Sequence, residues 1–129
     1  MSDRQEPMEN GIFARTIERV LAELPEELRA ALGTVQIVVQ ERPSTEQLAS
    51  VGLDPDEDLF GLFEGLSLKE APLGSDRTFP DRVILFQEPL ARHFPRRAEL
   101  EREIRTTLIH ELGHYFGFDE EELHERGWE

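Results

Sequence analysis

The segment His110-Glu111-Leu112-Gly113-His114 lies inside a run whose apolar residues recur at intervals of three and four. Side chains with that spacing share one side of an α-helix, so the run predicts a helix with a distinct apolar face. This face holds Ile104, Leu108, Leu112, Tyr115 and Phe116. The opposite face holds Thr107, His110, Glu111 and His114. The chain must therefore fold around a helix that contributes both to the core and to a polar surface.

The polar face carries a metal-binding pattern. His110 and His114 are four residues apart, about one helical turn, so their imidazoles can converge on one cation, and this geometry suits zinc. Glu111 follows the first histidine and stands beside the metal, near the water that a zinc site would activate. We interpret His110 and His114 as zinc ligands and Glu111 as a general base.

A third ligand is expected shortly after the helix. Gly117 predicts the helix end, because glycine readily takes the left-handed conformation of a helix C-cap. Three residues later Glu120 completes the pattern HExxHxxGxxE, and we interpret it as the third ligand, since catalytic zinc sites commonly take three protein ligands. Its neighbours in sequence compete for this role: Asp119, Glu121, Glu122 and His124. The acidic run would also stabilise the start of a following helix.

The chain resembles the mini-zincins, a family of small bacterial metallopeptidase-like proteins. The matching segments follow the family's order between about residues 10 and 128, and they are 59–65, 80–86, 107–118 and 123–128. The resemblance implies a compact α+β zincin-like fold, a zinc site on the HExxH helix and peptidase activity. The family has Asp at the position of Glu120, which is acidic but one methylene longer.

Little chain follows the motif. Only fifteen residues come after His114, too few for the separate helix that carries the third ligand in thermolysin-like enzymes. Both methionines, Met1 and Met8, lie upstream, so the methionine-containing turn of metzincins is also missing. We therefore expect a minimal zincin, with a flexible N-terminus at residues 1–9 and a single domain over residues 10–129.

Composition limits the classes of partner and site. The 129 residues carry a net charge of −14, which disfavours binding to nucleic acid or to anionic membranes. The chain has no cysteine, so a zinc site must use histidine and carboxylate ligands. No segment has the apolar length of a signal peptide or membrane span. We expect a cytoplasmic protein that acts on a peptide or protein substrate.

The local patterns predict a sheet of about three strands packed against helices. Strands are expected over residues 35–40, 60–64 and 82–87. Helices are expected over residues 10–32 with a break at Pro25, and over 89–94, 95–116 and 120–126; residues 43–52 form a short helix or loop. Residues 54–58 read as an acidic linker, and 66–80 as a connection. In larger zincins, which the chain resembles, an edge strand above the site pairs with substrate, and 60–64 and 82–87 are both candidates here.

Three further residues have structural interpretations. His93 is expected at the surface, and Trp128 is expected to cap the core near the terminus. Tyr115, the only tyrosine, falls on the core face of the motif helix, so the sequence offers no second donor for an oxyanion. The leading hypothesis is a zinc-dependent peptidase. The alternative is a non-catalytic or weakly active zinc-binding interaction module, which would have no need of a base at Glu111.

Overall fold

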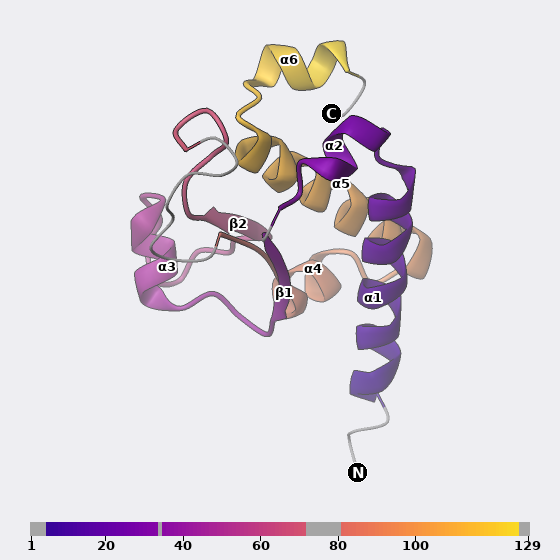
Figure 1. Ribbon diagram of the computed structural model, residues 1–129. Helices are drawn as coiled ribbons and strands as arrows, with labels where there is room; N and C mark the ends of the chain where they lie inside the picture. Colours follow the sequence, from indigo (N-terminus) through magenta and orange to yellow (C-terminus); the bar gives the residue numbers. More distant parts are fainter. Residues whose placement is uncertain (1–4, 34, 72–80, 127–129) are drawn as a thin grey trace.

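The computed structural model describes residues 5–33, 35–71 and 81–126, in which six helices surround a small mixed sheet (Figure 1). The helices are α1 (Gln5–Glu23), α2 (Glu26–Ala30), α3 (Thr45–Ser50), α4 (Gln87–His93), α5 (Arg97–Phe116) and α6 (Glu120–Glu125). The strands are β1 (Gln36–Gln40), β2 (Gly61–Glu64) and β3 (Arg82–Phe86). The predicted α+β class, with three strands and the motif on a long helix, is confirmed.

The sheet has the order β1-β3-β2, with β1 parallel and β2 antiparallel to the central strand. The side chains of β3 alternate between its two faces. Val83 and Leu85 join the larger core, whereas Ile84 and Phe86 join a smaller cluster on the other face. All four are fully buried, which explains why β3 reads as a continuous apolar run.

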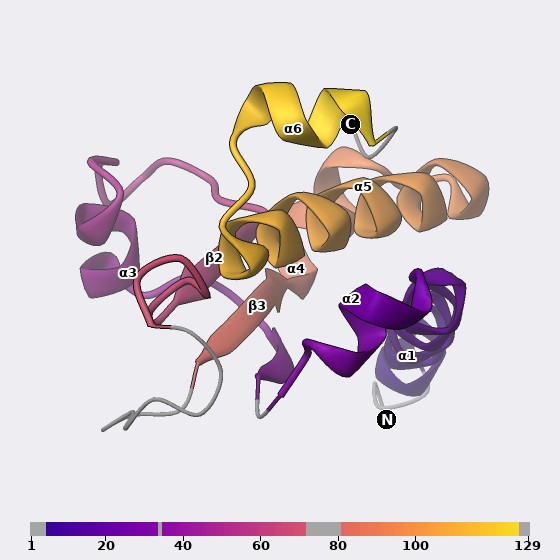
Figure 2. The same cartoon turned by 45° about the horizontal axis from the view of Figure 1, so that its top comes forward.

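The larger core lies where α1, α5 and the sheet meet (Figure 2). The motif helix α5 contacts α1, α4, β2 and β3, so it is held from several sides. Its predicted apolar face is confirmed, because none of these side chains is more than 7% exposed: Ile104, Leu108, Leu112, Tyr115 and Phe116. Burial of this face fixes the rotation of α5, and the polar face is thereby turned outward.

Several element boundaries differ from those predicted. Helix α1 already begins at Gln5, within the segment 1–9 that was predicted to be flexible, and residues 1–4 lie outside the described residues. Gln87 is the first residue of α4 rather than the last of β3, and Pro89 lies in the first turn of α4, where its missing N–H is tolerated. The predicted connection is described only as far as residue 71, and Trp128 is not among the described residues. None of the described helices is long and apolar enough to span a membrane.

Candidate active site

The polar face of α5 brings the three motif side chains together. His110, Glu111 and His114 each offer a ligand atom, and these atoms lie within 4.8 Å of one another. The imidazole rings of His110 and His114 meet edge to face, with centroids 4.8 Å apart. Glu111 Oε1 lies 3.2 Å from His114 Nδ1. The i, i+4 spacing thus places both histidines and a carboxylate in one cluster, as predicted.

Helix α5 ends where the sequence predicted, at Gly117. This glycine has φ 84°, in the left-handed region, and its N–H donates to the carbonyl of His114 at 3.1 Å. The N–H of Phe118 donates to the carbonyl of Gly113 at 2.9 Å, which closes the helix end. The chain therefore turns back over α5, and α6 begins beside the histidines.

A capping box occupies two of the carboxylates that competed for the third ligand position. Asp119 is the N-cap of α6, and its side chain accepts from the N–H of Glu122 at 2.8 Å. The Glu122 side chain in turn accepts from the N–H of Asp119 at 2.9 Å. These two side chains start the helix, and Glu120 between them remains directed toward the histidines. Glu121 and His124 are exposed on α6.

Glu120 reaches the histidine pair from α6. Its Oε2 lies 3.5 Å from Nε2 of His110. Two ligand atoms that each lie about 2.1 Å from a tetrahedral zinc are about 3.4 Å apart, so this separation is the one that two zinc ligands would have. Glu120 therefore lies beside His110, and Glu111 lies beside His114.

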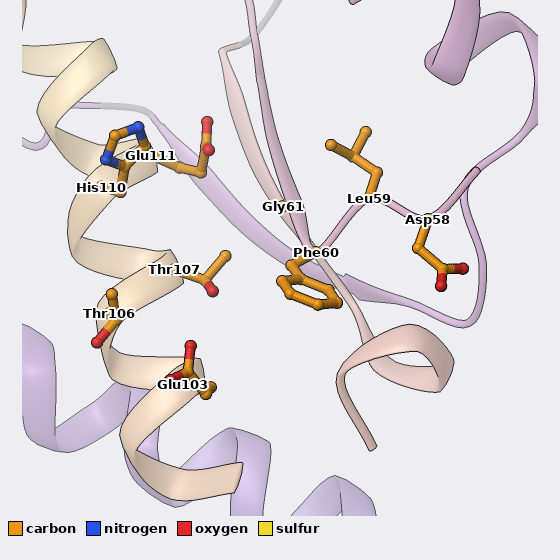
Figure 3. A pocket seen from close by; sticks show the side chains of 9 residues that line it. All are labelled: Asp58, Leu59, Phe60, Gly61, Glu103, Thr106, Thr107, His110 and Glu111. Carbon is orange, nitrogen blue, oxygen red and sulfur yellow. The ribbon is translucent and has the colours of Figure 1, made fainter. Parts of the chain in front are cut away.

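A groove beside α5 distinguishes the environments of the two carboxylates, Glu111 and Glu120. It has a volume of about 440 Å³ and runs between α5 and the segment 58–61 (Figure 3). His110 and Glu111 line the groove, whereas Glu120 does not. The side chain of Glu111 is only 12% exposed and that of Glu120 is 68% exposed. Glu111 thus faces the groove, and Glu120 approaches His110 from outside it.

A family model described as zincin-like metallopeptidase matches residues 32–128. The chain belongs to this family. The match spans β1 to the C-terminal side of α6 and includes the whole histidine and carboxylate cluster, so the resemblance drawn from the sequence is confirmed. Among curated proteins no match was found.

Membership of the zincin-like metallopeptidases implies a metal ion, typically zinc, and the donor set of this chain fits one. Two imidazoles and a carboxylate are a common ligand set of catalytic zinc sites, and they leave one position open. The hydrogen bond that His114 donates to Glu111 raises the pKa of His114 above its usual value, and attraction to Glu111 and Glu120 adds to this while burial opposes it. The cluster therefore favours positive charge, as a cation site should.

Residues outside the motif also shape the zincin-like site. His93 is at the surface as expected, but its Nε2 lies 2.7 Å from Oδ2 of Asp58, and its ring meets Phe60 edge to face. Arg92 donates to the other oxygen of Asp58 at 2.8 Å. The end of the predicted acidic linker is therefore tied to α4 and forms a wall of the groove. Only the three-dimensional contact reveals this role, because Asp58 and His93 are 35 positions apart.

Tyr115 has the structural role that the sequence predicted. Its hydroxyl donates to the carbonyls of Leu32 and Ala31, at 2.9 and 3.2 Å, and its ring packs edge to face on Phe63. The side chain is 1% exposed. The only tyrosine of this zincin-like chain therefore links α5 to the residues that follow α2, and it is not among the residues that line the groove.

Proposed function

We propose that the protein is a zinc-dependent peptidase in which His110, His114 and Glu120 hold the metal and Glu111 is the general base. The observation that carries this proposal is the separation of the two carboxylates. Glu111 lines the groove and Glu120 lies outside it, so one is suited to act on a reacting water and the other to ligate. This division of roles is the one expected for a catalytic zinc site with an open position.

Zinc, when bound, would supply Lewis-acid polarisation of the scissile carbonyl and of a water. Glu111 would take a proton from the attacking water as the C–O bond forms, and it would deliver this proton to the amine nitrogen as the C–N bond breaks. The low exposure of its side chain and its contact with His114 hold the carboxylate in one place. Preorganisation of this kind supports efficient proton transfer.

The sheet supports a peptide as the substrate. Strand β2 is an edge strand, whereas β3 is central, so of the two candidate strands β2 is the one that can pair with an extended chain. The N–H of Phe86 donates to the carbonyl of Phe60, so by the alternation of an antiparallel ladder Gly61 and Phe63 direct their backbone groups to the free edge. Gly61 also borders Glu111, which brings that edge next to the base.

The first test is the zinc content of the purified protein, measured by elemental analysis beside the variants His114→Ala and Glu120→Ala. We expect about one zinc per wild-type chain and a loss in both variants. The matched control is Glu121→Ala, which removes the neighbouring exposed carboxylate of α6 and should keep the metal. Retention of zinc by Glu120→Ala would reassign the third ligand, and no zinc in the reconstituted wild type would overturn the proposal.

The second test separates a peptidase from a zinc-binding module without turnover. Wild type and Glu111→Gln are both loaded with zinc and incubated with a mixed peptide library, and new N-termini are counted by mass spectrometry. We expect cleavage by the wild type only, with equal zinc content and equal melting temperature in the two proteins. Zinc binding without cleavage in the wild type would favour the interaction module.

A further inference from the structure

The groove beside Glu111 extends away from the histidines along α5. One wall is formed by Glu103, Thr107 and Glu111, which follow one another at four-residue intervals on the same side of the helix (Figure 3). The other wall is the segment 58–61 that leads into β2. The groove therefore starts at the proposed catalytic residues and continues along α5 in the N-terminal direction as far as Glu103.

The middle of this groove is apolar, and its far end is acidic. Leu59, Phe60, Thr106 and Thr107 line it between the proposed catalytic residues and Glu103. Two carboxylates of the groove lie away from His110 and His114, and they differ in their ion-pair partners. Asp58 is paired with Arg92 and His93, whereas Glu103 has no ion pair or hydrogen bond with any residue that the structure describes.

Glu103 is also only partly exposed. A half-buried carboxylate without a partner binds a cation more strongly than a fully solvated one does, because it has already lost part of its hydration. An aliphatic ligand would cover this carboxylate without neutralising its charge, and an acidic ligand would be repelled. The groove is therefore suited to a side chain with an apolar stem and a cationic head.

The length of the groove agrees with such a side chain. Glu103 and His110 are seven positions apart, which is roughly 10 Å along the helix axis. An extended lysine or arginine side chain spans roughly 6 to 7 Å from its Cα, and a charge-assisted hydrogen bond adds about 3 Å. A residue whose backbone lies at the histidines would thus place its cationic group at Glu103.

We propose that this groove selects peptides with an arginine or lysine side chain next to the reacting bond, and that Glu103 is the specificity-determining residue. The proposal deepens the proposed function, on which it rests, because it names the substrate class of the same site. The net charge of −14 acts in the same direction, since it attracts basic peptides and repels acidic ones.

The test compares two peptides that differ in charge but hardly in shape, Ac-Ala-Ala-Arg-Ala-Ala-amide and the same peptide with citrulline in place of arginine. Each is titrated into the full-length, zinc-supplied protein carrying Glu111→Gln, so that no peptide is cleaved. Binding is followed by NMR at the backbone amides of Phe60, Gly61 and Thr107. We expect about fivefold tighter binding of the arginine peptide, as a partly exposed ion pair contributes.

Two further variants in the same background decide the assignment. Glu103→Gln should remove the preference, so that both peptides bind alike. Glu18→Gln is the matched control, because it changes the net charge equally at an exposed position of α1, outside the groove, and it should keep the preference. Equal binding before mutation, a preference that survives Glu103→Gln, or no shift at these amides would overturn the proposal. The assay needs no turnover, so its result is separate from that of the peptidase test.

Discussion

Leu123 of α6 packs directly on Gly113 of α5, and a Cβ built on Gly113 would lie 2.6 Å from Leu123 Cδ2. Leu123 is 1% exposed, so it anchors α6 to the motif helix. Glu120 lies one turn earlier on α6, and its distance from His110 depends on this close packing. Gly113 therefore helps to place the carboxylate of Glu120 beside His110.

Gly113→Ala tests this relationship. The added methyl group has to displace Leu123, so we expect a loss of about 1 to 3 kcal/mol in the free energy of unfolding of the metal-free protein. The shift of α6 moves Glu120 away from His110, and we expect zinc affinity to fall about tenfold. Zinc competition with a fluorescent chelator measures this. Gly11→Ala, at a helical glycine with room for a Cβ, is the control and should leave zinc affinity unchanged. Wild-type zinc affinity in Gly113→Ala would show that α6 does not position the ligand.

Gly61 has a similar role on the other side of Glu111. A Cβ at this position would lie 2.6 Å from Cγ2 of Thr107 and 3.2 Å from Cγ of Glu111. We expect Gly61→Ala to lower the rate of peptide cleavage by about tenfold or more, because the base is displaced, while zinc content stays at the wild-type level. Cleavage of the best library peptide and elemental analysis provide the two readouts.

A double variant sharpens the test at Gly61. Thr107→Ser removes Cγ2, the atom closest to the added methyl group, and keeps the hydroxyl. Combined with Gly61→Ala it should restore part of the lost rate, whereas Thr107→Ser alone should have little effect. Additive losses in the double variant would argue against a steric origin.

The sequence predicted the parts of this molecule that depend on local pattern. The spacing of Leu108, Leu112 and Tyr115 orients α5 because burial of one face fixes the other. Gly117 ends the helix because its left-handed conformation is a local property of glycine. The proposed ligands and base lie within eleven residues on this helix and turn, from His110 to Glu120, so the sequence alone could indicate them.

What the sequence could not predict depends on contacts between distant segments. Both candidate substrate strands, 60–64 and 82–87, are rich in apolar residues, and only the strand order shows that β3 is central and β2 lies at the edge. The groove wall at Asp58 is fixed by Arg92 and His93, more than thirty positions away. Glu103 is one of many carboxylates in the sequence, and only its place in the groove distinguishes it from the others.

Tyr115→Phe tests the structural interpretation of the only tyrosine. The variant leaves the part-buried carbonyls of Ala31 and Leu32 without the phenolic donor, and we expect the free energy of unfolding to fall by about 1 kcal/mol, as the loss of one such donor usually costs. Zinc content and peptide cleavage should remain at wild-type values. Urea unfolding beside both assays measures this. A selective loss of cleavage with unchanged stability would instead give Tyr115 a catalytic role.

Asp58→Asn removes the ion pairs that tie the groove wall to α4. We expect it to lower the free energy of unfolding by an amount that depends on pH. Hydrogen bonds from Arg92 and from His93 hold the pKa of Asp58 below its usual value of 3.8. The pKa of Asp58 is lower in the folded protein than in the unfolded chain. The ion pairs therefore stabilise the fold fully at pH values above the pKa of the unfolded state, and this stabilisation is lost as the pH falls through the pKa of the folded state.

The free energy of unfolding of the variant should therefore be lower than that of wild type at pH 7, by no more than about 1 kcal/mol for such exposed pairs. This gap between the two proteins should close toward pH 3 and below. Urea unfolding at several pH values measures the gap. Asp56→Asn, at an exposed neighbour without an ion pair among the described residues, should match wild type throughout. A gap that stayed constant down to pH 2.5 would mean that Asp58 acts through packing, because protonation would then have removed nothing.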